Sequence, residues 1–323
     1  MTDIRRIEAA RTRLAGNIRR TPLLHAPSLD RIAGRRILVK AECLQITGSF
    51  KARGAWSAIS ALPEDVRARG ILAYSSGNHA QGIAWAAAKH GVSAVIVMPE
   101  DAPAAKVAGT KGYGAEVVQY DRARESREDI GRALAAERGL TLIPPYDFPD
   151  VIAGQGTAGL EIAEQAAEAG VNQADVLVCC GGGGLSSGIA LSLAATAPGL
   201  RMRPVEPVGF DDVKRSLETG ERQKNAALTG SICDAILTPE PGELTFPILR
   251  QHAGPGLLVS DEEALEAVGL AYRHLKIVVE PGGAVALAAA MFRSDEVPGD
   301  AVIAVASGGN VDSALFSKAI ANA

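Results

Sequence analysis

Lys51 stands in the stretch GSFKARGA, between a phenylalanine and a run of small residues. An amine becomes a useful nucleophile when burial or a nearby positive charge lowers its pKa. The alternative is a lysine on a helix surface, whose stem covers apolar neighbours while its ammonium stays in water. The other motifs of the chain decide whether Lys51 is a nucleophile or an ordinary surface lysine.

Three glycine-rich turns follow predicted strands, namely SSGNH at 75–79, GGGGL at 181–185 and SGGN at 307–310. The carboxyl ends of strands in an open α/β sheet form a ligand crevice, where helix N-termini offer free N–H groups to an anion. Four successive glycines remove every side chain that would keep a phosphate from the backbone. A tight turn between a strand and a helix would use the same glycines for their conformational freedom.

The elements that must position these turns alternate between strand and helix almost from end to end. Strands are predicted at 35–42, 70–76, 93–99, 115–120, 139–144, 174–180, 200–206 and 300–307. Helical patterns separate them, and Ser49 is expected to cap the helix at 51–62. This alternation predicts an α/β fold class with two open, mostly parallel, twisted-sheet domains and a ligand cleft between them.

The amino-acid composition argues against some classes of binding partner. Of 323 residues, 47% are hydrophobic and 4% aromatic, and the formal net charge is −4. No basic stripe with interleaved aromatics is present, which argues against nucleic acid as a partner. No apolar run approaches the roughly 20 residues of a membrane span, and residues 1–16 have the pattern of an amphipathic helix. The four cysteines lack a CxxC spacing, so we expect reduced thiols in a cytoplasmic protein.

A dinucleotide-binding fold is one alternative for the tetraglycine turn. Gly181 and Gly183 begin the fingerprint, Ser186 replaces its third glycine, and Glu206 ends the next strand where a ribose-binding acid belongs. A protein of this kind would be an NAD-dependent dehydrogenase. That interpretation leaves Lys51 and the other two turns without a role.

The motifs GSFKARGA, SSGNHAQG, GQGT, GGGGL, VEP, EPGGA and SGGN occur in this order across nearly the whole chain. Together they resemble the fold-type II pyridoxal-phosphate enzymes, specifically the serine/threonine dehydratase and serine racemase family. The resemblance implies a tryptophan synthase β-like arrangement, with a large cofactor-binding domain at 1–65 and 149–323 and a small substrate-loop domain at 66–148. It also implies that Lys51 forms the Schiff base with the cofactor aldehyde and, once displaced, carries a proton.

The resemblance assigns the other cofactor contacts to the three turns. Phe50 would pack beside the cofactor ring, Asn78 would bond its hydroxyl, and Ser307 would face its pyridine nitrogen. The phosphate would rest on backbone N–H groups of Gly181, Gly182, Gly183, Gly184 and Leu185. From its position alone, Ser307 could instead be an ordinary turn residue.

The same resemblance implies a substrate loop, in which the α-carboxylate is bound by Ser75, Ser76, Asn78 and His79. Ser76 matches the residue that in racemases protonates the face opposite the lysine, although it could equally cap the following helix. Arg127 lies where a related racemase supplies an arginine for a second carboxylate, such as that of 3-hydroxyaspartate. On a helix of alternating charges it could also be simply solvated.

A divalent cation site is implied at Glu206 and Asp212, completed by the carbonyl of Phe210. Such oxygen ligands suit Mg²⁺ or Ca²⁺, with Mn²⁺ a further option. The alternative is that Asp211 and Asp212 only cap the helix that follows.

These observations predict a pyridoxal 5'-phosphate-dependent ammonia-lyase that dehydrates a small β-hydroxy amino acid. Threonine and serine are the default substrates and 3-hydroxyaspartate is a variant; homodimerisation is carried from the family. The alternatives are an amino-acid racemase of the same family, the NAD-dependent dehydrogenase, and a non-catalytic protein that binds an amino acid.

Overall fold

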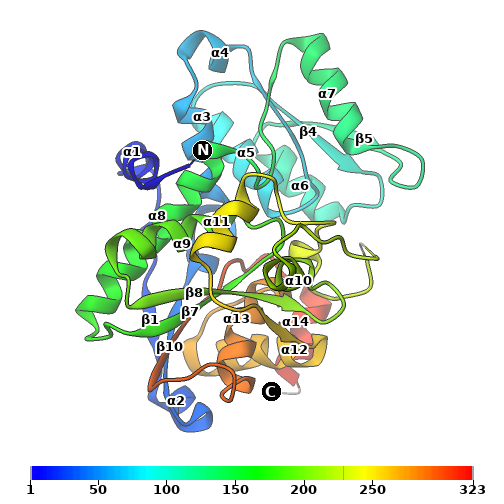
Figure 1. Ribbon diagram of the computed structural model, residues 1–323. Coiled ribbons are helices and arrows are strands. Elements are labelled where there is room, and N and C mark those ends of the chain that lie inside the picture. The colour runs from blue at the N-terminus through cyan, green and yellow to red at the C-terminus, as the bar shows by residue number, and fades with distance from the viewer. Residues whose placement is uncertain (1, 228, 322–323) are drawn as a thin grey trace.

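Two β-sheets with helices on their faces make up the protein, as the computed structural model shows for residues 2–227 and 229–321 (Figure 1). The smaller sheet lies at the top of Figure 1 and the larger one below it. Both sheets are mostly parallel, so the predicted α/β fold class is confirmed.

The larger sheet has six strands in the order β1-β2-β10-β7-β8-β9. Only the pairing of β1 with β2 is antiparallel. Because helices cover both faces, the central strands are near-continuous apolar runs and not alternating ones. The strands are β1 (Leu23–His25), β2 (Arg36–Lys40), β7 (Ala174–Cys179), β8 (Leu200–Pro207), β9 (Leu257–Val259) and β10 (Ala301–Val305).

The helices around this sheet include α13, which is almost entirely buried and is composed of small and apolar residues. Helix α12 begins with a capping box at Ser260 and Glu263 and runs on into one π-helical turn at Ala271–Leu275. The helices are α1 (Ile4–Leu14), α2 (Pro27–Ala33), α8 (Pro149–Glu168), α9 (Gly184–Thr196), α10 (Asp212–Thr219), α11 (Thr245–His252), α12 (Asp261–Leu270), α13 (Pro281–Phe292) and α14 (Ser313–Ala321).

The smaller sheet has four parallel strands in the order β5-β4-β3-β6. They are β3 (Ile71–Tyr74), β4 (Ala94–Pro99), β5 (Glu116–Tyr120) and β6 (Thr141–Leu142), with helices α4 (Glu64–Ala68), α5 (Asn78–Lys89), α6 (Ala104–Gly112) and α7 (Arg127–Arg138). All these strands fall within the segment expected to form a small domain. The exact domain boundaries at 65/66 and 148/149 remain a prediction.

Helix α3 (Lys51–Ala61) packs against both α5 and α8. The GQGT motif at 154–157 lies in α8 and allows this helix to approach α3 closely. A Cβ at Gly154 would lie 2.5 Å from the carbonyl oxygen of Arg53. Gln155 accepts a hydrogen bond from the backbone N–H of Gly54 at 3.1 Å. The motif therefore fixes the helix that begins with Lys51.

Arg53 of α3 belongs to an ionic cluster of four side chains: Lys40, Glu42, Arg53 and Glu161. Arg53 is 1% exposed. It bonds Glu42 at 2.8 Å and Glu161 at 2.7 Å. Lys40 bonds the second oxygen of Glu161 at 2.5 Å. Two cations thus face two carboxylates, which is the condition for burying charge without a large penalty.

The start of α3 differs from the prediction. Ser49 does not cap the helix: Phe50 occupies the cap position without a side-chain bond, and the Ser49 hydroxyl is buried without a partner among the described residues. The reason is that Ser49 is extended and forms a β-bridge with Gly308, which turns it away from the first turn of α3. The short elements β1, β9, α2 and α11 were not predicted. Within residues 2–227 and 229–321, no helix is both long enough and apolar enough to span a bilayer.

Candidate active site

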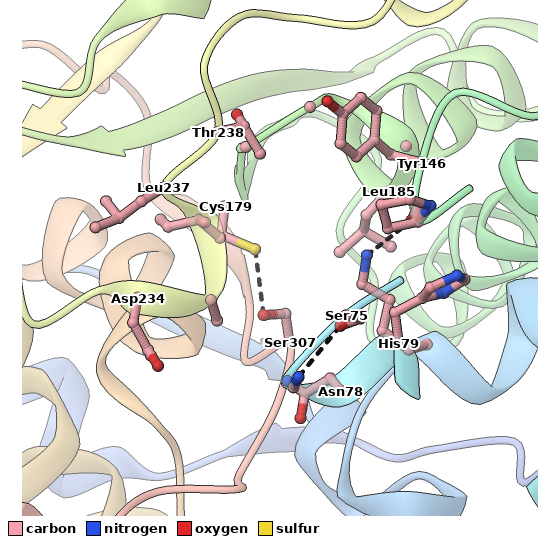
Figure 2. A pocket seen from close by; sticks show the side chains of 18 of the residues that line it. Ser75, Asn78, His79, Tyr146, Cys179, Leu185, Asp234, Leu237, Thr238 and Ser307 are labelled. Carbon is pink, nitrogen blue, oxygen red and sulfur yellow. Dashed lines mark hydrogen bonds between the residues drawn. The ribbon is translucent and has the colours of Figure 1, made fainter. Parts of the chain in front are cut away.

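A pocket opens where the carboxyl ends of β3, β7 and β10 face one another, and Figure 2 shows the side chains around it. It brings together every residue predicted to bind cofactor or substrate. Its lining includes Phe50, Lys51, Ser75, Ser76, Asn78, His79, Arg127, Gly181, Gly182, Gly183, Gly184, Leu185 and Ser307. The residues predicted to bind a metal are not part of this lining.

Lys51 lies inside the pocket as a partly buried amine and not on an exposed helix surface. Its Nζ donates a hydrogen bond to the carbonyl of Pro145 at 2.8 Å and lies 5.1 Å from the centre of the Phe50 ring. Burial lowers the pKa of Lys51 to about 8, against opposing effects of Cys179 and Glu280. A substantial neutral fraction near neutral pH is what a nucleophilic amine requires.

The tetraglycine turn has no room for side chains. A Cβ at Gly181 would lie 2.9 Å from the carbonyl oxygen of Ile236, and one at Gly182 would enter the ring of Tyr146. Gly183 has φ 92°, a conformation that favours glycine, and it precedes α9 without a side-chain cap. A helix start of this kind offers free N–H groups to an anion such as a phosphate.

The turn at 75–79 joins β3 to α5. Ser75 accepts a hydrogen bond from the N–H of Gly77 at 3.1 Å, which shapes the turn. Burial lowers the pKa of His79 to about 3, so its ring is neutral. Because a carbonyl can only accept, Nε2 of His79 donates to Ile143 at 2.9 Å. The His79 side chain therefore anchors the turn, while Ser76 lines the pocket without a hydrogen bond to another described residue.

Ser307 follows β10 and meets the last residue of β7. Cys179 donates a thiol hydrogen bond to the Ser307 hydroxyl at 3.2 Å (Figure 2). Burial raises the pKa of Cys179 to about 11, which keeps this sulfur protonated. Sequence reasoning gave Cys179 no place in the site, although its position directly before the tetraglycine turn could have indicated one.

Arg127 begins α7 and reaches the pocket. Its side chain is 38% exposed, and its Nε donates to Glu128 at 2.8 Å. The guanidinium carbon lies 5.4 Å from the centre of the Tyr74 ring. Neither terminal nitrogen of Arg127 bonds another residue in the described part of the chain, so both are available to a ligand. Solvent also reaches this side chain, so its role toward a substrate stays a prediction.

Glu280 is a pocket residue that sequence reasoning missed, although the EPGGA motif contains it. It is 5% exposed and accepts a hydrogen bond from Nδ2 of Asn78 at 2.5 Å. Burial raises the pKa of Glu280 to about 7. Lys106 and Asp234, which were also not predicted, form an ion pair at 3.0 Å that bridges helix α6 of the small sheet to the opposite pocket wall.

Glu206 and Asp212 lie together outside the pocket, both buried. Glu206 accepts from the N–H groups of Val213 and Lys214 at 2.9 and 2.7 Å, and so caps α10 from the end of β8. Burial raises the pKa of both carboxyls, and Oδ2 of Asp212 is buried without a partner among residues of the described ranges. This orphaned oxygen fits a cation. Across these ranges no group of three or more His, Cys, Asp or Glu is placed to hold a metal.

The dinucleotide alternative does not fit this arrangement. A ribose-binding acid must lie beside the ligand, whereas Glu206 is fully buried and does not line the pocket that contains the tetraglycine turn. The alternative to a metal site, in which Asp211 and Asp212 only cap α10, finds no support at Asp211: it occupies the cap position without a side-chain cap bond.

Two mostly parallel sheets, a partly buried amine in the pocket between them and a helix start made of glycines suit an α/β enzyme that anchors a phosphate-bearing aldehyde. The family described as pyridoxal-phosphate dependent enzyme matches residues 14–308. The chain belongs to this family, and its cofactor is pyridoxal 5'-phosphate. The predicted family and cofactor are therefore confirmed.

Three similar proteins illustrate the match. The chain is 46% identical to an L-threo-3-hydroxyaspartate ammonia-lyase of a Pseudomonas species over 304 residues, which cover 94% of this chain and 93% of the relative. It is 43% identical to the enzyme of the same name from Saccharomyces cerevisiae over 312 residues, with 96% and 94% covered. A solved threonine deaminase, from the organism abbreviated T.th., shares 47% identity, with TM-score 0.90 and coverage of 96% and 99%. The predicted ammonia-lyase activity agrees with these names.

Proposed function

We propose that the protein is an ammonia-lyase for a 3-hydroxyaspartate, a β-hydroxy amino acid with a second carboxylate. The single observation that carries this choice is Arg127, whose terminal nitrogens have no partner among the described residues and which lines the same pocket as Lys51. Planar guanidinium and carboxylate groups pair through two parallel hydrogen bonds, which a threonine methyl group cannot accept. The two relatives that carry this activity in their names support the proposal.

The residues present fit the cofactor, which supplies a sink for the negative charge that develops at the substrate α-carbon. Lys51 would anchor it, and the tetraglycine turn would bind its phosphate. Asn78 would hold its ring hydroxyl and Phe50 would pack beside its ring. The Ser307 hydroxyl, which does not force protonation of a pyridine nitrogen, would face that atom.

The neutral Nζ of Lys51 would remove the α-proton once the substrate amine has taken its place; its lowered pKa of about 8 supports this role. The turn at 75–79 would hold the α-carboxylate through the N–H groups at the start of α5. Loss of the β-hydroxyl with a proton gives water and an enamine. The enamine becomes an imine, which takes up water and yields a 2-oxo dicarboxylic acid and ammonia, so that the net change is loss of ammonia alone.

The test is turnover by the purified protein of serine, threonine and each of the four 3-hydroxyaspartate isomers, with release of ammonia and keto acid measured. We expect one hydroxyaspartate isomer to be the best substrate by kcat/KM. In Arg127→Met this value should fall roughly a hundredfold, as expected when charge-assisted hydrogen bonds are lost, while threonine turnover changes little. Arg132→Met is the matched control, since Arg132 is an exposed arginine on the same helix. Preference for threonine, unaffected by Arg127→Met, contradicts the proposal.

A second candidate activity, racemisation, is favoured by Ser76. Its hydroxyl lines the pocket with no bond to another described residue, so it is available to deliver a proton. Racemisation of L-serine or L-aspartate that disappears in Ser76→Ala, with elimination retained, would support this activity. Equal racemisation by wild type and variant would count against it.

We further propose that Glu206, Asp212 and the carbonyl of Phe210 hold Mg²⁺, Ca²⁺ or Mn²⁺. The buried Asp212 oxygen without a described partner supports this site. A cation would support the fold of the β8–α10 connection and take no part in the chemistry. Added Mg²⁺ should raise the unfolding temperature of the wild type but not of Asp212→Asn, whereas equal responses contradict the site.

We also propose that the protein works as a homodimer in the cytoplasm. The family resemblance supports the dimer, and Tyr272 and Val278 expose apolar surface in one stretch of chain. All four cysteines are free and buried, which suits a reducing compartment. Light scattering that gives the mass of two chains would support the dimer, and the mass of one chain would contradict it.

A further inference from the structure

Two motifs of the sequence, EPGGA and SGGN, place polar side chains on either side of Asn78. From the first, Glu280 accepts a hydrogen bond from Nδ2 of Asn78 at 2.5 Å. From the second, Asn310 donates from its Nδ2 to Oδ1 of Asn78 at 2.7 Å. Three segments that are far apart in the chain, the starts of α5 and α13 and the turn after β10, thus meet at one amide.

The direction of each hydrogen bond in this series follows from the groups at its two ends, the Thr47 carbonyl and the Glu280 carboxylate. Asn310 also donates from Nδ2 to the backbone carbonyl of Thr47 at 2.8 Å. A carbonyl only accepts, so the Asn310 nitrogen must face Thr47 and donate its other hydrogen to Asn78. An ionised Glu280 also only accepts, which requires the nitrogen of Asn78 on that side. An isolated amide can flip between two similar orientations, whereas this one has a single orientation that satisfies both neighbours.

The backbone around Glu280 is arranged for this contact. The N–H of Glu280 donates to the carbonyl of Gly308 at 2.9 Å, which ties the start of α13 to the SGGN turn. A Cβ at Gly308 would collide with Oε1 of Glu280 and would lie 3.0 Å from Nδ2 of Asn78. A glycine at 308 is therefore required for the carboxylate and the amide to meet.

One hydrogen of the Asn78 amide remains after these bonds are made. Nδ2 carries two hydrogens and donates one of them to Glu280. Asn78 lines the pocket near Ser307 (Figure 2), so the second hydrogen is available to an acceptor bound there. The proposed acceptor at this position is the hydroxyl oxygen of the cofactor ring.

We propose that Glu280 and Asn310 are positioning residues that lock the amide of Asn78, so that its second Nδ2 hydrogen always points to the ring hydroxyl of the cofactor. The inference rests on the proposed function, because it uses the cofactor orientation assumed there. It assigns a role to two residues that do not themselves carry a proton in the reaction. The locked amide stabilises one charge state of the ring hydroxyl, which sets the colour of the bound cofactor and contributes to its affinity.

The test compares the visible absorption band of the bound cofactor, and its dissociation constant from dialysis, in four variants of the full protein. Glu280→Gln keeps an acceptor for Asn78, whereas Glu280→Met removes it. Asn310→Leu removes the donor on the other side. Gln165→Met is the matched control, because Gln165 is buried with two hydrogen-bond partners, Lys40 and Thr21, but lies outside the pocket.

We expect Glu280→Met and Asn310→Leu to shift the band and to weaken cofactor binding roughly tenfold, the order expected for one lost hydrogen bond to a ligand. Glu280→Gln should restore both properties to near the wild-type values, and Gln165→Met should alter neither. A wild-type band and affinity in Glu280→Met, or the same loss in Gln and Met variants, would overturn the proposal. No substrate is added, so a wrong substrate assignment would leave these results unchanged and would be detected only in the ammonia assay.

Discussion

Lys40 is fully buried and Lys51 is partly buried in the pocket, and the surroundings of the two amines differ completely. In the ionic cluster, Lys40 bonds Glu161, Gln165 and the carbonyl of Thr21. In the pocket, Lys51 bonds one carbonyl, that of Pro145. Burial lowers the pKa of both amines, but carboxylates oppose the effect strongly only around Lys40. Removal from water alone therefore does not make an amine reactive; the absence of a paired carboxylate distinguishes Lys51 from Lys40.

Replacement of the pocket amine should have the largest effect on activity. Lys51→Ala should lower kcat at least about a thousandfold, because proton transfer by a positioned base and the cofactor anchor are lost together. Its free energy of unfolding should change little, since no carboxylate is left unpaired. Steady-state ammonia release and denaturant unfolding measure the two effects, and a variant that kept activity while losing stability would reverse the roles assigned to these lysines.

Loss of a cation from the ionic cluster should have the largest effect on the free energy of unfolding. Arg53→Met leaves Glu42 and Glu161 without their main cation, and such a break in a buried ion pair costs about 3–5 kcal/mol. Denaturant unfolding of the variant should show this loss. The triple variant Arg53→Met, Glu42→Gln and Glu161→Gln should recover part of it, because the unpaired charges are gone. No loss in the single variant would mean that the cluster is solvated.

The rate at which Lys51 captures the cofactor should depend on pH, because only the neutral amine reacts. Its pKa lies at about 8 in the folded protein, below the ordinary value of 10.5. The neutral, reactive fraction therefore rises about tenfold per pH unit below 8 and levels off above it. Stopped-flow capture of pyridoxal phosphate by the cofactor-free protein should show this profile. A rate still rising tenfold per unit between pH 9 and 10 would contradict the lowered pKa.

The smallest effect concerns Tyr74, whose ring lies against Arg127. A cation–π contact at a partly exposed site contributes about 0.5–1 kcal/mol, so Tyr74→Leu should lower kcat/KM for 3-hydroxyaspartate about threefold. Tyr74→Phe keeps the ring and should behave as wild type. Threonine turnover serves as the internal reference, and an equal fall for both substrates would exclude a role in holding Arg127.

The site was predictable to the extent that its chemistry resides in short motifs. Lys51, the tetraglycine turn and Ser307 are each marked by local sequence, and the alternation of strands and helices implied that their turns share one edge of the fold. Arg127 was placed by resemblance alone, because its helix has no local signal of a pocket.

What escaped prediction depends on contacts between distant segments. Glu280 meets Asn78 although 202 residues separate them, and no periodicity reports such a pairing. Ser49 was expected as a helix cap from its residue type, but its pairing with Gly308 takes precedence over that local preference. The three-residue strands β1 and β9 are defined by their pairing with β2 and β8, and so short a stretch carries no periodicity of its own.

The most direct test of the central claim is borohydride reduction of the protein after loading with pyridoxal phosphate, followed by peptide mapping. We expect one reduced pyridoxyl group, attached to Lys51, with Lys40 unmodified in the same digest. A label on Lys40, or no stable label on any lysine, would contradict the claim that a pocket amine without a paired carboxylate is what selects position 51.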